Sequence, residues 1–262
     1  MTTPSKTRCI PSPEHGILLV LCVLLLSAWE WAARRGSISP LYFPAPSVLA
    51  ETLLRMIRTG ALLADLLPTL GRLVSGLCLG GLSGLVLGLL MGWSKRLRRV
   101  FDPIVAASHP LPKIAVLPLL LIILGIGESA KITAIALAAF FPMLINAMAG
   151  VQEIHPAHFE LARGYGANRL QIFLRVVLPA SLPMVMAGVR LAMNVAWLVT
   201  IAVEIVAASS GLGSMIWMAR ETMHTEEIYA ALVVISLIGV CANWVLRQLT
   251  LRLIPWQREK LI

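Results

Sequence analysis

Long apolar stretches with almost no charged side chains constrain this chain more than any other feature. A helix needs about 20 mostly apolar residues to cross the hydrocarbon core of a bilayer. Six stretches come close to that length or exceed it, and they cover residues 16–33, 66–93, 103–125, 132–151, 183–208 and 228–246. Only 13% of the 262 residues are charged, whereas roughly a quarter are charged in soluble domains. The sequence therefore excludes a soluble enzyme and predicts one all-α integral membrane domain with six transmembrane helices.

The formal net charge of +9 fits a membrane protein better than a nucleic-acid-binding protein. The Lys and Arg residues lie between the apolar stretches, where anionic lipid headgroups and the positive-inside bias account for them. With both termini in the cytoplasm, the cytoplasmic segments hold roughly twice as many Lys and Arg residues as the outer ones. We therefore expect cytoplasmic N- and C-terminal tails at residues 1–15 and 247–262, membrane lipids as partners and no nucleic acid.

The first apolar stretch is expected to stay in the protein as a span. The apolar run from Ile17 to Ala28 is followed by Trp29, Glu30 and Trp31, without the small-residue pattern that a signal peptidase needs. The four cysteines show no metal-binding spacing, so we expect neither a disulfide nor a metal site.

Two outer loops are expected, at residues 34–65 and 209–227. The first loop contains apolar residues at helical spacing after Pro46, with charged residues on the other side. The apolar set is Leu49, Leu53, Met56 and Ile57. This pattern predicts an amphipathic helix that lies on the outer membrane surface.

Five glycines follow one another at intervals of four in the second stretch. They are Gly76, Gly80, Gly84, Gly88 and Gly92. Small residues at this interval let the backbones of two membrane helices approach closely. The ridge predicts a packing face, whose partner is either another helix of this chain or a second copy.

The third stretch contains four prolines, each of which removes a backbone donor. Its helix over residues 103–125 is therefore expected to be kinked or broken. Lys113 lies between Pro112 and Ile114 in this stretch. It either offers a cation to an anionic solute or extends to cytoplasmic headgroups, and the sequence leaves both readings open.

Glu204 is the one acidic residue well inside an apolar stretch, where an unpaired charge costs several kcal/mol. Arg72 lies at a matching depth in its own span, so we expect the two to pair. The pair either gates the translocation path or only fixes how the two helices align with each other. Asn194 and Trp197, close to Glu204 on the same span, are further candidates for lining a translocation path.

The segment at residues 152–182 is long for a connection and carries its own pattern. A short helix is expected over residues 157–163, with Gly164 or Gly166 as its stop. A second helix is expected over residues 168–178, ended by Pro179. Such a helix-turn-helix suits docking into a groove of another protein.

The spacing within this segment resembles the EAA loop of ABC-importer permeases. Glu160-Leu161-Ala162 is followed after three residues by Gly166, and nine residues later by Val176, one residue, and Leu178-Pro179. Leu161 and Val176 replace the alanine and isoleucine of the usual motif. Further blocks at residues 112–115, 117–118, 125–131 and 211–213 are similar to the nitrate, sulfonate and taurine group of these permeases, nearest its aliphatic-sulfonate branch.

The resemblance implies the MetI-like architecture of type I importers in the inner membrane. It also implies a second copy of the chain, two ABC ATPase subunits and an external solute-binding protein. The ATPase-coupling residues would be Glu160, Leu161, Ala162, Gly164, Gly166, Leu178 and Pro179. In this picture Ala162 lets the helix lie close to its partner, Gly166 permits the turn, and Glu160 caps or pairs locally.

No G-x-x-x-x-G-K-[ST] phosphate-binding loop occurs in the sequence. We therefore expect the chain to hold no cofactor of its own and the partner ATPase to bind ATP and Mg²⁺. The resemblance implies alternating access driven by that ATPase.

Two other function classes are alternatives to an ABC-importer permease. An ion-gradient-driven secondary transporter is the main alternative, although no inverted repeat is apparent. A membrane enzyme is disfavoured because no catalytic cluster of His, Asp or Glu occurs. The sequence is compatible with a sulfonate, taurine, nitrate, bicarbonate or a neutral vitamin precursor as the transported solute.

Overall fold

The computed structural model describes residues 13–207 and 209–256, and all regular structure in these residues is helical. The longer helices are α1 (Pro13–Arg34), α2 (Pro46–Arg58), α3 (Ala61–Trp93), α4 (Lys95–Ser108), α6 (Glu128–Gln152), α9 (Leu178–Ala207), α10 (Leu212–Glu221) and α11 (Thr225–Leu253). The shorter ones are a 3₁₀ turn η1 (Lys113–Val116), α5 (Leu117–Leu124), α7 (Pro156–Gly164), α8 (Arg169–Ile172) and a π-helical turn η2 (Phe173–Val177). Most of the predicted N-terminal tail lies outside the described residues, whereas the predicted C-terminal tail begins within a helix, because α11 continues to Leu253.

Five of these helices are long and apolar enough to cross a membrane, and a bent pair makes a sixth candidate. The five are α1, α3, α6, the continuous helix that includes α9, and α11. The bent pair joins residues 95–108 to residues 113–124 at 88°. The number of spans predicted from the sequence is therefore compatible with the structure.

The third predicted span, expected to be kinked or broken over residues 103–125, is broken. Its first part, α4, already begins at Lys95, before the predicted start at residue 103, and it ends at Ser108. Pro110 and Pro112 have no backbone N–H and follow that end, so the chain cannot continue the hydrogen-bond ladder. Pro103 lies inside α4 and does not end this helix. The break is therefore an abrupt turn rather than a bend within one helix.

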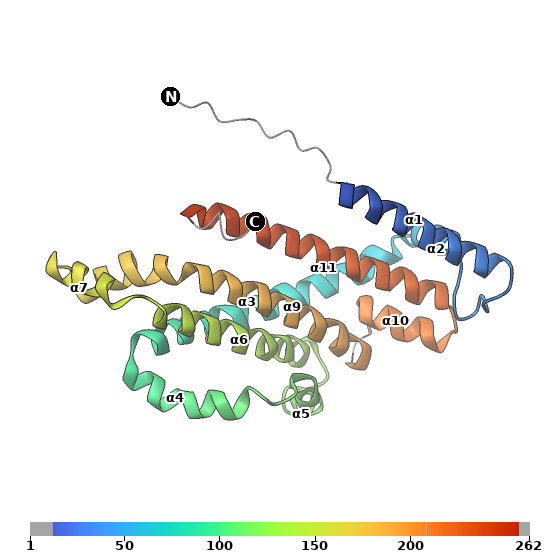
Figure 1. Ribbon diagram of the computed structural model, residues 1–262. Helices are drawn as coiled ribbons and strands as arrows, with labels where there is room; N and C mark the ends of the chain where they lie inside the picture. Colours follow the sequence, from blue (N-terminus) through green and yellow to red (C-terminus); the bar gives the residue numbers. More distant parts are fainter. Residues whose placement is uncertain (1–12, 208, 257–262) are drawn as a thin grey trace.

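Helix α6 lies at the centre of the bundle, packed between α3 and α9 (Figure 1). The glycine ridge of α3 faces α6. A Cβ atom added at Gly80 would overlap the carbonyl of Ala136, and one at Gly84 would overlap the carbonyl of Phe140. The ridge therefore packs within the chain, through direct approach of two helix backbones.

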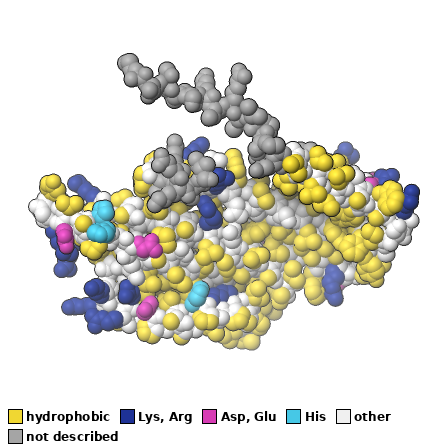
Figure 2. Space-filling model, in the orientation of Figure 1, with side chains coloured by type: hydrophobic (Ala, Val, Ile, Leu, Met, Phe, Trp, Pro, Cys, Tyr) yellow, Lys and Arg dark blue, Asp and Glu magenta, His cyan; other side chains and the backbone are white. Residues whose placement is uncertain are grey.

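The outer surface of the bundle is strongly apolar along its middle and charged toward one end (Figure 2). Lys and Arg side chains gather at the end where α7 lies. Helix α1 exposes most of its apolar side chains, including Leu18 and Leu25, which are 60% and 62% exposed. Such an unburied apolar helix belongs in lipid rather than in water.

The predicted amphipathic helix is present as α2, which packs against α11 and α3. Leu49 and Met56 are buried on its inner face, whereas Ile57 is exposed. Arg55 pairs with Glu227 in the first turn of α11, with 3.3 Å between Nη2 and Oε1. The placement of α2 on the membrane surface stays a prediction.

Candidate functional site

The hairpin formed by α7, α8 and the turn between them lies at one end of the bundle (Figure 1). Helix α7 confirms the helix predicted over residues 157–163. Its chain reverses through Gly166, whose φ of +75° lies in the left-handed region. The Ala167 N–H donates to the Ala162 carbonyl at 3.0 Å and closes this turn. Gly166 is therefore the residue that the turn requires, because a Cβ atom disfavours this φ.

The second helix of the hairpin begins as predicted and ends differently. Asn168 and Gln171 form a capping box, with both side-chain to backbone hydrogen bonds at 2.8 Å. The prediction that Pro179 ends this helix was wrong, because α8 continues through the π-helical turn η2 into α9. In η2 the Leu178 N–H donates to the Phe173 carbonyl. This wider turn lies just before Pro179, where a proline disrupts regular α-helical bonding, and it lets the helical path continue.

The hairpin exposes large apolar side chains outside the bundle. Leu161 is 62% exposed, Tyr165 is 89% exposed and Leu170 is 65% exposed. Glu160 is also exposed and makes no side-chain hydrogen bond within the described part of the chain. Apolar side chains on a short helix that ends in open space are typical of an interaction surface.

Ala162 faces the opposite way and packs against the hydrophobic core of the bundle. Its small side chain therefore lets the hairpin lie close to the bundle, and its role in coupling to an ATPase stays a prediction. Gly164 ends α7 with open space around it, while Leu178 and Pro179 lie at the start of α9.

A cluster of charged and hydroxyl side chains joins α3, α6, α9 and the start of α10 at the other end of the bundle. We refer to Thr69, Arg72, Glu128, Lys131, Glu204 and Ser210 as the Arg72 cluster. Arg72 Nη1 lies 2.6 Å from Glu204 Oε1, and both side chains are buried. Arg72 also makes two hydrogen bonds to Glu128, at 2.6 and 2.8 Å. Lys131 Nζ lies 2.9 Å from Glu128 Oε1.

The Arg72 cluster also holds the loop that leads into α10. Arg72 donates to the Ser210 carbonyl at 2.7 Å, and the Gly213 N–H donates to Glu204 Oε2 at 3.0 Å. The Leu212 N–H donates to Thr69 Oγ1 at 2.9 Å. Gly211 has a φ of +116°, and a Cβ atom there would overlap the Glu204 carboxylate. Gly211 and Gly213, which flank Leu212, thus allow the backbone of this loop to come within hydrogen-bond distance of the buried Glu204 carboxylate.

The structure contains the Arg72 and Glu204 pair that matching depth predicted. The sequence did not predict that Glu128 pairs with Arg72 or that Lys131 pairs with Glu128. Both residues lie in the 125–131 block that resembles ABC-importer permeases. A usable signal was their spacing of three residues, which places opposite charges on one helical face. Whether the pair gates transport stays a prediction.

The other candidate path residues do not join the Arg72 cluster in the described part of the chain. Lys113 Nζ donates to the His109 carbonyl and lies 4.5 Å from the centre of the Phe141 ring, so it closes the end of α4. Asn194 accepts a hydrogen bond from Asn243 Nδ2 at 3.1 Å. Asn194 and Trp197 line an open groove of about 320 Å³ between α9 and α11.

Comparison with known proteins assigns the chain to a family. The profile of the family described as "Binding-protein-dependent transport system inner membrane component" matches residues 84–258, more than half of the chain. The taurine transport system permease protein TauC of Escherichia coli (strain K12) is 36% identical over 241 residues, which cover 90% of this chain and 88% of the relative. Protein SsuC of Bacillus subtilis (strain 168), assigned by name to aliphatic sulfonates transport, is 33% identical and covers 92% of this chain and 87% of the relative.

A solved structure supports the same fold. A chain of the inward facing MetNI methionine ABC transporter aligns with a TM-score of 0.64 at 22% identity, covering 72% of this chain and 94% of that one. The predicted all-α, MetI-like architecture is thereby confirmed.

Proposed function

This chain belongs to the family of binding-protein-dependent transport system inner membrane components, and we propose that it carries a small sulfonate such as taurine. Family membership and the relatives make it a multi-pass inner membrane permease subunit of an ABC importer. The proposed solute rests on relatives whose names refer to taurine and to aliphatic sulfonates. Nitrate, bicarbonate and a neutral vitamin precursor are the solutes against which it is to be tested.

The proposed complex contains two copies of this chain, two ABC ATPase subunits and an external binding protein. A second copy is favoured because the groove at Asn194 and Trp197 is open to the outside of a single chain. The two ATPase subunits would bind ATP and Mg²⁺ and hydrolyse ATP, since this sequence has no phosphate-binding loop.

The hairpin end of the bundle is proposed to face the cytoplasm. Lys95, Arg96, Arg98 and Arg163 line the pocket beside the hairpin, and positive residues favour the cytoplasmic side. This orientation agrees with the expectation of cytoplasmic termini.

The exposed apolar hairpin is the single observation that carries the proposed mechanism. An ATPase that grips α7 and α8 would act on α9 directly, because α8 and α9 are joined by a continuous helical path. Closure of the ATPase dimer would then tilt α9 and, through its packing, α6. Alternating access follows if this tilt opens the bundle to one side at a time.

Gly166→Val is expected to lower ATP-driven uptake at least about tenfold, because a β-branched residue is strained at a φ of +75°. A Cβ atom at this position meets no other atom within 4 Å, so the helix bundle should still fold. The measurement is taurine uptake into vesicles that hold the permease, its ATPase and its binding protein. Gly60→Val is the matched control, because Gly60 has a φ of +76° and open space around it but lies outside the hairpin.

The same vesicles test the alternative function. Uptake that follows a proton or sodium gradient without ATP would contradict an ATP-driven importer and favour a secondary transporter. Full uptake by Gly166→Val would contradict coupling through the hairpin. Uptake of nitrate but not of taurine would overturn the proposed solute alone.

A further inference from the structure

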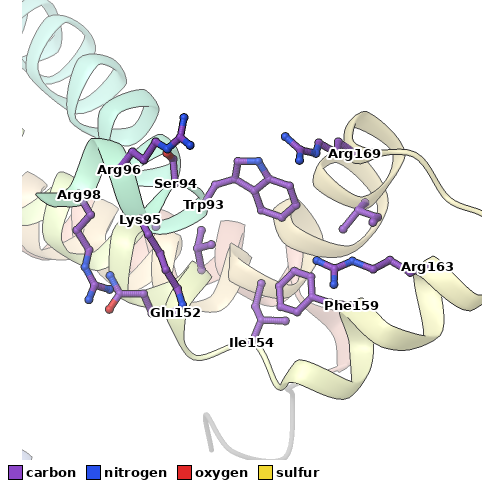
Figure 3. Close-up of a pocket in the computed structure, with 13 residues that line it drawn as sticks. Trp93, Ser94, Lys95, Arg96, Arg98, Gln152, Ile154, Phe159, Arg163 and Arg169 are labelled. Carbon is purple, nitrogen blue, oxygen red and sulfur yellow. The ribbon is translucent and has the colours of Figure 1, made fainter. Parts of the chain in front are cut away.

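A large cavity separates the hairpin from the ends of two membrane spans (Figure 3). It has a volume of about 1230 Å³. Its walls come from the end of α3, the start of α4, the end of α6, and from α7 and α8. The proposed function uses the exposed side of the hairpin and leaves this inner side without a role.

The cavity combines an apolar floor with a cationic rim. The apolar residues are Trp93, Val151, Ile154, Phe159 and Ile172. The cationic residues are Lys95, Arg96, Arg98, Arg163 and Arg169. None of the residues that line the cavity is acidic, and none of these five cations forms an ion pair with another described residue. Five unpaired cations around one space predict an anionic occupant.

The cations converge from three separate helices. Figure 3 shows Arg96 of α4 and Arg169 of α8 on either side of Trp93, and Arg163 of α7 beside Phe159. Helix α4 also begins at this cavity, and its 14 residues direct the positive end of the helix dipole into it. An anion in the cavity would therefore contact both the span ends and the hairpin.

The cavity lies at the ends of apolar helices, where a membrane-spanning helix is expected to reach the headgroup layer. Two apolar spans end at its wall, α3 at Trp93 and α6 at Gln152. Tryptophan is enriched at this level in membrane proteins. Next to the cationic first turn, α4 exposes the apolar side chains of Val100 and Ile104, which are 64% and 57% exposed. A cationic site beside exposed apolar surface suits an amphiphile better than a soluble anion or an acidic peptide.

We propose that this cavity binds the phosphodiester headgroup of an anionic phospholipid, whose acyl chains lie along the exposed apolar side of α4. The bound phosphate joins α4 to α7 and α8 and holds the hairpin in a fixed position relative to the span ends. Anionic lipid thereby supports the transfer of force from the ATPase to the bundle. Binding itself does not depend on the proposed function, but the effect on force transfer rests on it.

The test measures lipid binding to the purified full-length permease by native mass spectrometry, using phosphatidylglycerol and phosphatidylcholine with the same acyl chains. Phosphatidylglycerol should bind more tightly, and the triple variant Arg96→Gln/Arg163→Gln/Arg169→Gln should lose this preference. Each cation near an anionic headgroup contributes about a fivefold change, so three should weaken binding by about a hundredfold. All three side chains are exposed, so the fold should persist, and the thermal unfolding midpoint verifies this.

The control variant Arg58→Gln/Arg99→Gln/Arg175→Gln removes the same charge from exposed positions that do not line the cavity. It should retain phosphatidylglycerol binding. Equal losses in the two triple variants would overturn the proposal, because the effect would then come from net charge. Displacement of the lipid by millimolar inorganic phosphate would also overturn it and indicate a site for a soluble anion. Loss of lipid on addition of the ATPase would overturn it in favour of a protein contact.

A second readout separates this proposal from the proposed function. If the permease imports taurine with ATP but shows no phosphatidylglycerol preference, the lipid site is wrong and the importer assignment stands. If the lipid preference is present but ATP drives no uptake, the site stands and the proposed function fails.

Discussion

Gly80→Leu is expected to prevent α3 from packing against α6, whereas Gly71→Leu on the same helix is expected to leave the bundle intact. A Cβ atom at Gly80 would already overlap the backbone carbonyl of Ala136. A backbone atom in the middle of a helix cannot rotate away as a side chain can, so the two helices would have to separate. Overpacking of a core commonly costs about 1–3 kcal/mol, and this clash between backbones should exceed that range.

Gly71 is the matched control because it lies in α3 with no atom within 4 Å of an added Cβ. Gly71 does not have a positive φ, so a side chain at this position causes no backbone strain. The measurement is the yield of monodisperse protein in mild detergent and its unfolding temperature. Equal yields from the two variants would contradict direct packing of the ridge on α6.

The glycine ridge also shows what a sequence pattern predicts and what it leaves open. A spacing of four places all five glycines on one face of a helix, and this depends only on local geometry. The choice between α6 and a second copy depends on how distant segments meet, which no local pattern contains. The structure resolves this by placing Ile135, Ala136 and Val151 of α6 against the ridge.

The boundaries of the spans were less predictable than their number. Hydropathy predicts a span that begins at Ile132, but α6 already begins at Glu128 and includes Lys131. Hydropathy counts these charges as unfavourable in a span, whereas here Arg72 pairs with Glu128 and Glu128 with Lys131. Such compensation is a tertiary property, so it is invisible to a scan along the chain.

Pro179 failed as a helix stop for a related reason. Proline lacks a backbone donor, and the rule for helix ends assumes that the lost bond is not replaced. The π-helical turn over residues 173–177 changes the hydrogen-bond pattern just before it and lets the chain continue. The predicted partner surface at the hairpin did not depend on that end, because the exposed residues precede Pro179.

Arg72→Met is expected to destabilise the bundle by about 3–5 kcal/mol, because it leaves the buried Glu204 carboxylate without its cation. Glu204 would keep only the Thr69 hydroxyl and the Gly213 N–H. Glu204→Gln should cost less, because Arg72 retains two hydrogen bonds to Glu128 and one to the Ser210 carbonyl. The double variant Arg72→Met/Glu204→Gln should be more stable than Arg72→Met alone, since it removes the orphaned charge. A charge swap is less informative here, because a glutamate at position 72 would lie beside Glu128.

The measurement is thermal unfolding of each variant in the same detergent, together with ATP-driven uptake. Arg55→Met serves as the control, because its pair with Glu227 is solvent-exposed and should contribute under about 1 kcal/mol. If the double variant were no more stable than Arg72→Met, the buried carboxylate would not be the source of the loss. Uptake then separates the two roles that the sequence left open. A pair that only registers helices predicts that the stabilised double variant regains transport, whereas a gate that must form and break predicts a stable protein that transports nothing.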